Sequence, residues 1–154
     1  AEAPENPTQS AVKLRTTLIA ARHVSVGRKL GAGAFGAVYQ GWWRGIDCAL
    51  KFIESEAAEE LLRECDLLDT LEHPNVMRLY GVCDGDAPAV WPTGLVPPAI
   101  CCELLTEGTF LDFLRTVAPS VRGAHVSAST QEAHWAKLVS MLHGAARGLG
   151  YLHS

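Results

Sequence analysis

The chain has 154 residues, of which 48% are hydrophobic and 19% are charged. This composition is typical of a globular domain with a substantial core, and it excludes an intrinsically disordered chain. The formal net charge of −4 argues against a nucleic-acid-binding surface as the main role of the chain.

The five cysteines are an odd number and contain no C-x-x-C pair; they are Cys48, Cys65, Cys83, Cys101 and Cys102. Most of them fall within expected strands or a helix, which favours reduced, buried thiols over disulfides or a metal site. No apolar run reaches membrane-spanning length, and the N-terminus lacks the pattern of a signal peptide. We therefore expect an intracellular, cytoplasmic protein, and a membrane-anchored parent protein stays open as an alternative.

Residues 1–21 mix prolines and polar residues without a sustained period, which predicts a loose lead-in, with an extended segment at its end as an option. Residues 24–30 alternate apolar and polar side chains, as a half-exposed strand does. The folded domain is therefore expected to begin near residue 22.

Three glycines follow in the spacing G-x-G-x-x-G, at Gly31, Gly33 and Gly36. Such a loop lets backbone N–H groups approach phosphate oxygens, but it also opens dinucleotide-binding folds, in which a helix starts at the last glycine. Here β-branched and aromatic residues follow over 37–43, so a strand is expected instead. Arg44-Gly45 then indicates a turn, and residues 46–53 a further strand.

This arrangement resembles the ATP-binding hairpin of the protein kinases. The run Cys48-Ala49-Leu50-Lys51 stands where that family has V-A-I-K, and Val38 follows the glycines as in the family motif. The resemblance implies that Lys51 holds the α- and β-phosphates of ATP. Taken alone, Lys51 would equally fit a solvated lysine on a hairpin.

A helix is expected after a candidate N-cap at Ser55, with apolar residues at helical spacing at Leu61, Cys65, Leu68 and Leu71. Glu64 falls within this stripe, and an inward carboxylate must find a partner or stay protonated. Lys51 is the obvious partner, and the pair matches the lysine–glutamate ion pair of active kinases. The alternative is that Glu64 lies at the edge of the stripe and reaches water.

Residues 72–75, Glu-His-Pro-Asn, are expected to close this helix, with His73 as a structural link, and residues 76–82 to form the fourth strand. Residues 84–98 contain four prolines and predict an insertion between two strands. Within it, Trp91 is expected to fold back onto its own loop, with a surface anchor as the alternative.

Residues 99–105 form an apolar strand that runs into a connector and resembles the kinase hinge. The resemblance implies that Cys102 is the gatekeeper and that adenine bonds to the backbone of Glu103 and Leu105. The full ATP-binding set it implies is Leu30, Gly31, Ala32, Gly33, Ala34, Phe35, Gly36, Val38, Ala49, Lys51, Cys102, Glu103 and Leu105, with Lys51 and Glu64 as the catalytic pair.

A short helix is expected after the hinge, in which Asp112 fits a helix-face charge or a ribose contact equally well. Residues 116–130 are polar and irregular, and residues 131–153 return to a helix. Its apolar face consists of Trp135, Leu138, Leu142, Ala145, Leu149 and Leu152. The run 145–154 resembles the end of the long kinase helix that precedes the catalytic loop. Because an apolar helix face needs cover, we expect self-association through 131–153.

The expected fold class is α+β: a kinase-like N-lobe, with a five-stranded antiparallel sheet and one long helix, followed by the first helices of the C-lobe. The expected division is a lead-in over 1–21 and a kinase domain over 22–154, with the N-lobe over about 22–105 and the C-lobe portion over about 106–154.

The resemblance implies an ATP- and Mg²⁺-dependent kinase that phosphorylates Ser/Thr on a protein substrate and is similar to the tyrosine-kinase-like group. The family's H-R-D and D-F-G segments, which carry the catalytic base and the metal ligands, are not in this sequence. We therefore expect no metal site here and no appreciable phosphorylation by this polypeptide alone. The alternatives are a non-catalytic interaction module and, more distantly, a dinucleotide oxidoreductase.

Overall fold

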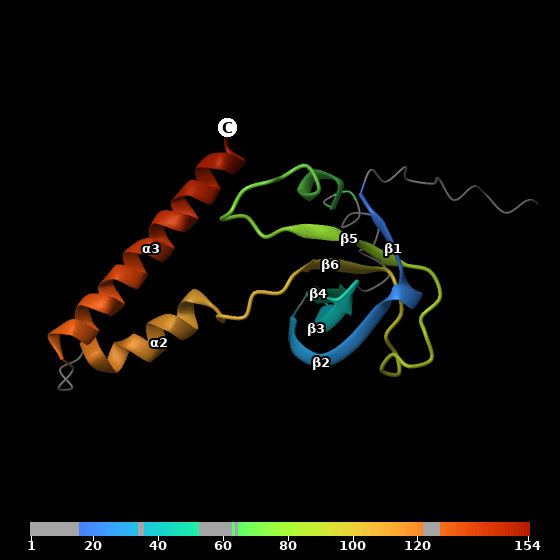
Figure 1. Ribbon diagram of the computed structural model, residues 1–154, viewed down its shortest axis with the longest axis horizontal. Coiled ribbons are helices and arrows are strands. Elements are labelled where there is room, and N and C mark those ends of the chain that lie inside the picture. The colour runs from blue at the N-terminus through green and yellow to red at the C-terminus, as the bar shows by residue number, and fades with distance from the viewer. Residues whose placement is uncertain (1–15, 34–35, 53–62, 64, 122–126) are drawn as a thin grey trace, which may run out of the picture.

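A computed structural model describes residues 16–33, 36–52, 63, 65–121 and 127–154. Figure 1 shows a sheet at one end of the molecule and two helices at the other. The strands are β1 (Leu18–Ala20), β2 (Val24–Gly33), β3 (Gly36–Trp43), β4 (Ile46–Phe52), β5 (Leu79–Asp84) and β6 (Ala99–Glu103). The helices are the short 3-10 helix η1 (Ala21–His23), α2 (Phe110–Val121) and α3 (Ala128–Leu152). The α+β class expected from the sequence is confirmed.

The six strands lie in the order β1-β5-β6-β4-β3-β2. All neighbours pair antiparallel except β1, which pairs parallel to β5 with Leu18 opposite Val82. The sheet therefore has one strand more than the five expected, and it is mixed instead of purely antiparallel. The added strand comes from the end of the predicted lead-in, where a three-residue strand is too short to show a period of its own.

The fourth predicted strand starts later than expected, at Leu79 instead of residue 76. Val76 is taken up in a turn, in which its N–H donates to the carbonyl oxygen of His73 at 3.0 Å. Arg78 accepts a hydrogen bond from the N–H of Glu103 at 2.9 Å, just ahead of β5. Because residues 76 and 77 are apolar, the sequence placed the start of this strand too early, ahead of the residues that pair.

Strand alternation gives the sheet two faces with separate cores. We call the inner face the one that carries Ile100 and Val82, which pack with Cys65 and Leu79 and with half-buried Leu68. The outer face carries the larger cluster, formed by Ile19, Ala21, Val24, Cys48, Leu50, Phe52, Cys83, Trp91, Ala99 and Cys101. The helix that includes Cys65–Leu68 therefore covers the inner face, and the connector over residues 85–98 contributes to the core of the outer face.

Trp91 shows how that connector, hereafter the insertion, covers the outer face. Its side chain is 6% exposed, and its indole Nε1–H donates to the carbonyl oxygen of Val24 at 2.9 Å. Its ring meets the Phe52 ring edge-on, with centroids 5.6 Å apart. The expectation that Trp91 folds onto its own loop is wrong, and so is the surface-anchor alternative. A buried tryptophan needs a partner for its N–H, and the neighbouring strand supplies one.

The helix α2 is longer than predicted, because it continues to Val121 through residues that were expected to be irregular from Thr116. The Thr116 hydroxyl donates to the backbone carbonyl of Asp112 at 3.0 Å, and Val117 is buried, so both residues are accommodated in the helix. Ser127 caps α3 by accepting a hydrogen bond from the N–H of Thr130 at 3.3 Å. The predicted long helix is confirmed, starting three residues earlier than expected.

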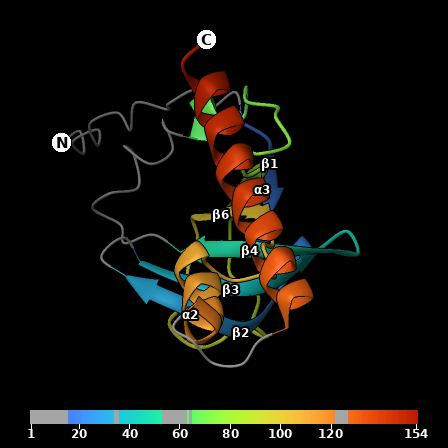
Figure 2. The same cartoon turned by 90° about the vertical axis from the view of Figure 1, so that its left-hand side faces the viewer.

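The C-terminal end of α3 docks on the turn that precedes β5 (Figures 1 and 2). The Tyr151 ring stacks on the His73 ring, with the ring centroids 5.0 Å apart. The Tyr151 hydroxyl accepts a hydrogen bond from the N–H of Glu72 at 3.0 Å. Gly148 allows this approach, since a Cβ there would lie 2.6 Å from the carbonyl oxygen of Asn75. His73 therefore has a structural role, but its ring contacts α3, whereas the sequence predicted a link between the preceding helix and the following strand. Within the described residues, no helix combines the length and apolar character that crossing a membrane requires.

Candidate functional site

The glycine-rich hairpin is formed by the ends of β2 and β3, in which Gly31 pairs with Val38 and Gly33 with Gly36. Gly36 has φ 106°, a backbone conformation that favours glycine. Gly31 and Gly33 do not have such a conformation, and a Cβ on either would meet no atom within 4 Å. Among the described residues, neither a packing contact nor a positive φ requires glycine at these two positions, and the missing side chains leave the backbone of the hairpin open. Ala34 and Phe35 lie outside the described residues.

The β4 strand brings Ala49 and Lys51 to the inner face, while Cys48, Leu50 and Phe52 are buried on the outer face. Lys51 stands between Val38 of β3 and Ile100 of β6, and its side chain is half-buried. The outer residues of β4 thus fix which way the strand faces, and alternation then carries Lys51 to the inner face. Glu64, the predicted partner of Lys51, lies outside the described residues, so this pair stays a prediction.

The β6 strand places Cys102 directly opposite Ala49. The Cys102 thiol donates to the Ala49 carbonyl across 3.7 Å, and both side chains are buried. Directly opposed residues share a face of the sheet, so Val38, Ala49, Lys51 and Cys102 form one continuous row on the inner face. Four residues predicted from three separate segments are thereby brought together.

The remaining predicted site residues surround this row. Leu30, Gly31, Ala32 and Gly33 lie on β2, Gly36 lies on β3, Glu103 ends β6, and Leu105 follows in the connector. Leu30 and Leu105 are 39% and 63% exposed, so two large apolar side chains are open to solvent beside the row. Sequence reasoning missed Ile100, which stands opposite Lys51 and packs with the helix at Cys65, because no motif marks it.

Two of the buried thiols, Cys102 in the row and Cys83 in the outer-face core, hold their protons tightly. All five cysteines are free and buried, which confirms the prediction of reduced, buried thiols. Burial raises the pKa of the Cys102 thiol to about 11, and that of the Cys83 thiol to about 12, from the ordinary value of 9.0. The thiolate, the reactive form, is therefore scarce at neutral pH.

Cys102 and Cys83 are expected to lower the stability above pH 9, because these two thiols hold their protons more tightly in the folded chain than in the unfolded one. Each of these thiols has a pKa that is higher in the folded chain than in the unfolded chain. Its contribution to the free energy of unfolding is therefore fully present below pH 9, and it is lost as the pH rises toward 11 for Cys102 and 12 for Cys83. Denaturant melts between pH 7 and 11 measure this loss. In parallel, iodoacetamide at pH 8 should label the native chain far more slowly than the urea-unfolded chain, and equal rates would contradict the account.

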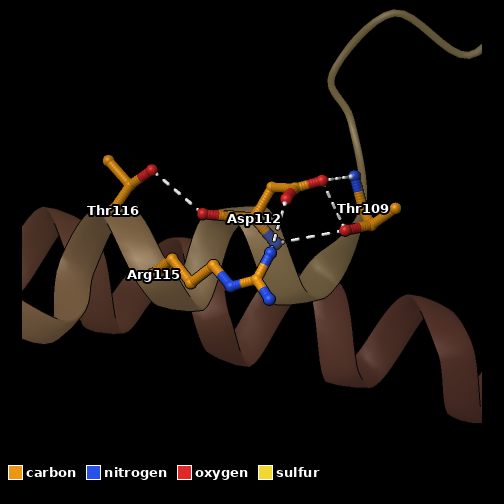
Figure 3. A network of polar contacts seen from close by, with 4 residues as sticks. All are labelled: Thr109, Asp112, Arg115 and Thr116. Atoms are coloured by element: carbon orange, nitrogen blue, oxygen red, sulfur yellow. Dashed lines mark hydrogen bonds and ion pairs between the residues drawn. The ribbon is translucent and has the colours of Figure 1, made fainter.

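Asp112 belongs to a capping network at the start of α2, shown in Figure 3. Its N–H donates to the Thr109 hydroxyl at 3.1 Å, and its carboxylate accepts from the N–H of Thr109 at 3.1 Å. Arg115 adds a contact at 3.5 Å. The Thr109 hydroxyl holds the pKa of the Asp112 carboxyl below its usual range. This reciprocal capping box accounts for Asp112 at this position, and a ribose contact stays a prediction.

Comparison with known proteins decides the family. Residues 24–154 match the sequence model of the family described as protein tyrosine and serine/threonine kinase. The chain belongs to the protein kinase family. The strand β1 and Thr16 precede the matched region.

The relatives of this kinase chain include both specificity classes. It is 30% identical over 138 residues to the probable serine/threonine-protein kinase drkA of Dictyostelium discoideum. The aligned region covers 85% of this chain and 18% of drkA. It is 32% identical over 130 residues to the tyrosine-protein kinase abl-1 of Caenorhabditis elegans. That aligned region covers 82% of this chain and 9% of abl-1. The chain thus spans less than a fifth of either relative.

Proposed function

We propose that the chain binds ATP on the inner face, beneath the glycine-rich hairpin. The observation that carries this proposal is the combination of Gly31 and Gly33, whose added Cβ would meet none of the described residues, with Lys51 on the same face as Val38. Backbone N–H groups and one lysine are a common means of holding phosphates.

In this proposal each predicted residue has a defined role. Lys51 holds the α- and β-phosphates, and Glu64 holds Lys51 in turn. Val38 and Ala49 cover the adenine ring, and Cys102 closes the back of its pocket, since small side chains leave room for a planar base. Adenine bonds to backbone groups of Glu103 and Leu105. Mg²⁺, when bound with ATP, neutralises phosphate charge; the described residues supply positioning, and none is assigned as a metal ligand.

For the whole protein, we propose phosphorylation of serine or threonine in protein substrates, in the manner of the tyrosine-kinase-like group, in the cytoplasm. The family match supports phosphoryl transfer, and the similarity to drkA, a probable serine/threonine-protein kinase, supports the acceptor class. The run of residues 111–114, Leu-Asp-Phe-Leu, supports the same subgroup. A peptide array with serine, threonine and tyrosine acceptors, phosphorylated by the whole protein, tests the acceptor class, and exclusive tyrosine phosphorylation would contradict it.

Replacing Lys51 by methionine is expected to weaken Mg·ATP binding by about tenfold or more, because a charged hydrogen bond to phosphate is lost without loss of chain length. Titration calorimetry of the chain with Mg·ATP measures this. Lys137→Met is the matched control, because Lys137 lies on α3 and pairs with Glu107 at 2.7 Å. If wild type shows no binding and Lys51→Met changes nothing, the phosphate site is refuted.

A second candidate, an interaction module, is favoured by the exposed apolar side chains of α3. Trp135, Val139 and Leu149 are 53%, 61% and 55% exposed. We propose that the chain self-associates through this face, since exposed apolar patches of this kind mark interfaces. Sedimentation should show a concentration-dependent mass that Leu149→Glu abolishes and Ser140→Glu, a polar exposed position on α3, leaves unchanged. A monomer at all concentrations would exclude this interface.

A further inference from the structure

Thr16 is the one polar residue that is buried among the described residues, at 3% exposed. Its hydroxyl donates to the Asp66 carboxylate at 2.6 Å, and its N–H donates to the same oxygen at 2.9 Å. The two residues are fifty positions apart in the chain. We call this pair the clamp. It joins the residue just ahead of β1 to the helix that covers the inner face.

The strand end of the clamp is fixed to the edge of the sheet. The carbonyl of Thr17 accepts from the N–H of Val82 at 2.9 Å, and β1 continues the pairing along β5. Gly81 makes room, because any Cβ at this position would collide with the Thr17 carbonyl oxygen. Thr16 is therefore held by the sheet, and it in turn holds Asp66.

The helix end of the clamp lies on the inner face of the sheet, close to Lys51. Cys65, next to Asp66, is fully buried against Leu79, Val82 and Ile100. Ile100 stands directly opposite Lys51 in the sheet. A shift of the helix at Cys65 would therefore be felt at the strand next to Lys51, through one intervening side chain.

We propose that Thr16 and Asp66 are positioning residues for nucleotide binding. They hold the helix that covers the inner face in the position at which the chain binds ATP. This inference rests on the proposed ATP site. Thr16 precedes the region that matches the kinase family, whereas Asp66 lies within that region.

Loss of the clamp is expected to lower the fraction of molecules in which the helix is placed for ATP binding. Hydrogen bonds to a carboxylate are stronger than those between neutral groups. When a competent state is only partly populated, the apparent affinity falls by the populated fraction. Removing the hydroxyl while keeping the side-chain shape should therefore weaken nucleotide binding without removing any group that touches the nucleotide.

The test uses Thr16→Val, which removes only the hydroxyl bond, and Asp66→Ala, which removes both. Mg·ATP titration is expected to show a loss of affinity of about threefold or more in each, with the double variant no weaker than Asp66→Ala. Thr16→Ser should restore wild-type affinity. Thr17→Val, an exposed neighbour whose backbone bond is retained, is the matched control and should bind as wild type.

Hydrogen exchange at residues 65–68 is the second readout, measured without nucleotide, and it should quicken in Thr16→Val but not in Thr17→Val. Unchanged exchange and unchanged affinity in Thr16→Val would overturn the inference. Faster exchange with unchanged affinity would also overturn it, because the clamp would then be structural alone. If wild type itself fails to bind Mg·ATP, the proposed site fails first, and a role in nucleotide binding falls with it.

Discussion

Replacing Trp91 by alanine is expected to destabilise the chain by about 3–5 kcal/mol, the usual loss for a buried aromatic side chain. The ring is 6% exposed, packs edge-on against Phe52 and donates a hydrogen bond to Val24. Removing it would open a cavity, leave the Val24 carbonyl without this donor and free the insertion from the outer face. Urea melts followed by circular dichroism measure the change in the free energy of unfolding.

Trp91→Phe is the control, because it keeps an aromatic ring and removes the indole N–H. It should lose about 1–2 kcal/mol, as expected for one buried hydrogen bond and a smaller ring. A loss below about 1 kcal/mol in Trp91→Ala would contradict the assignment of Trp91 to the core, since it would equal the effect of an ordinary surface substitution.

Gly81→Ala is expected to cost about 2–4 kcal/mol, through overpacking added to backbone strain. Gly81 has φ 150°, and an added Cβ would collide with the backbone carbonyl of Thr17, which cannot turn aside as a flexible side chain can. The pairing of β1 with β5 should therefore be lost. Amide exchange at Val82, whose N–H bonds to Thr17, reports this pairing directly.

Gly85→Ala separates the two causes. Gly85 also has a positive φ, 95°, but an added Cβ there would meet nothing within 4 Å. It should cost only the backbone strain, about 1–2 kcal/mol, and leave exchange at Val82 unchanged. Equal losses in the two variants would show that the close approach of β1 contributes nothing to stability.

The parts of the fold that the sequence predicts well are those with local causes. The turn at Arg44-Gly45 is one, since both residues have positive φ, 52° and 79°, and glycine favours such a conformation. The alternation of β4 is another, because its buried outer residues fix which face Lys51 occupies. The row from Val38 to Cys102 then follows from strand register. The apolar period predicted a helix over 131–153, and the structure has α3 over Ala128–Leu152.

The parts that sequence reasoning missed depend on contacts between distant segments. Trp91 bonds to a residue 67 positions away, and nothing in the proline-rich run around it indicates which surface it will meet. An extended segment at the end of the lead-in was an option from the sequence, but its pairing with β5 depends on Gly81, which admits the Thr17 carbonyl, and no periodicity reports that steric condition. The Thr16–Asp66 clamp, between two common polar residues, is invisible for the same reason. Asp112 was left with two interpretations because a capping box is recognised only once the helix start at Phe110 is known.

Labelling with an acyl-phosphate derivative of ATP, which acylates a lysine amine beside the bound phosphates, tests the central claim most directly. Mass spectrometry of the labelled chain should find the modification on Lys51, and excess Mg·ATP should suppress it, while the exposed Lys29 and the ion-paired Lys137 stay at background. That result would establish that nucleotide phosphates lie against Lys51 on the inner face. Equal labelling of the three lysines, unaffected by excess Mg·ATP, would contradict the account.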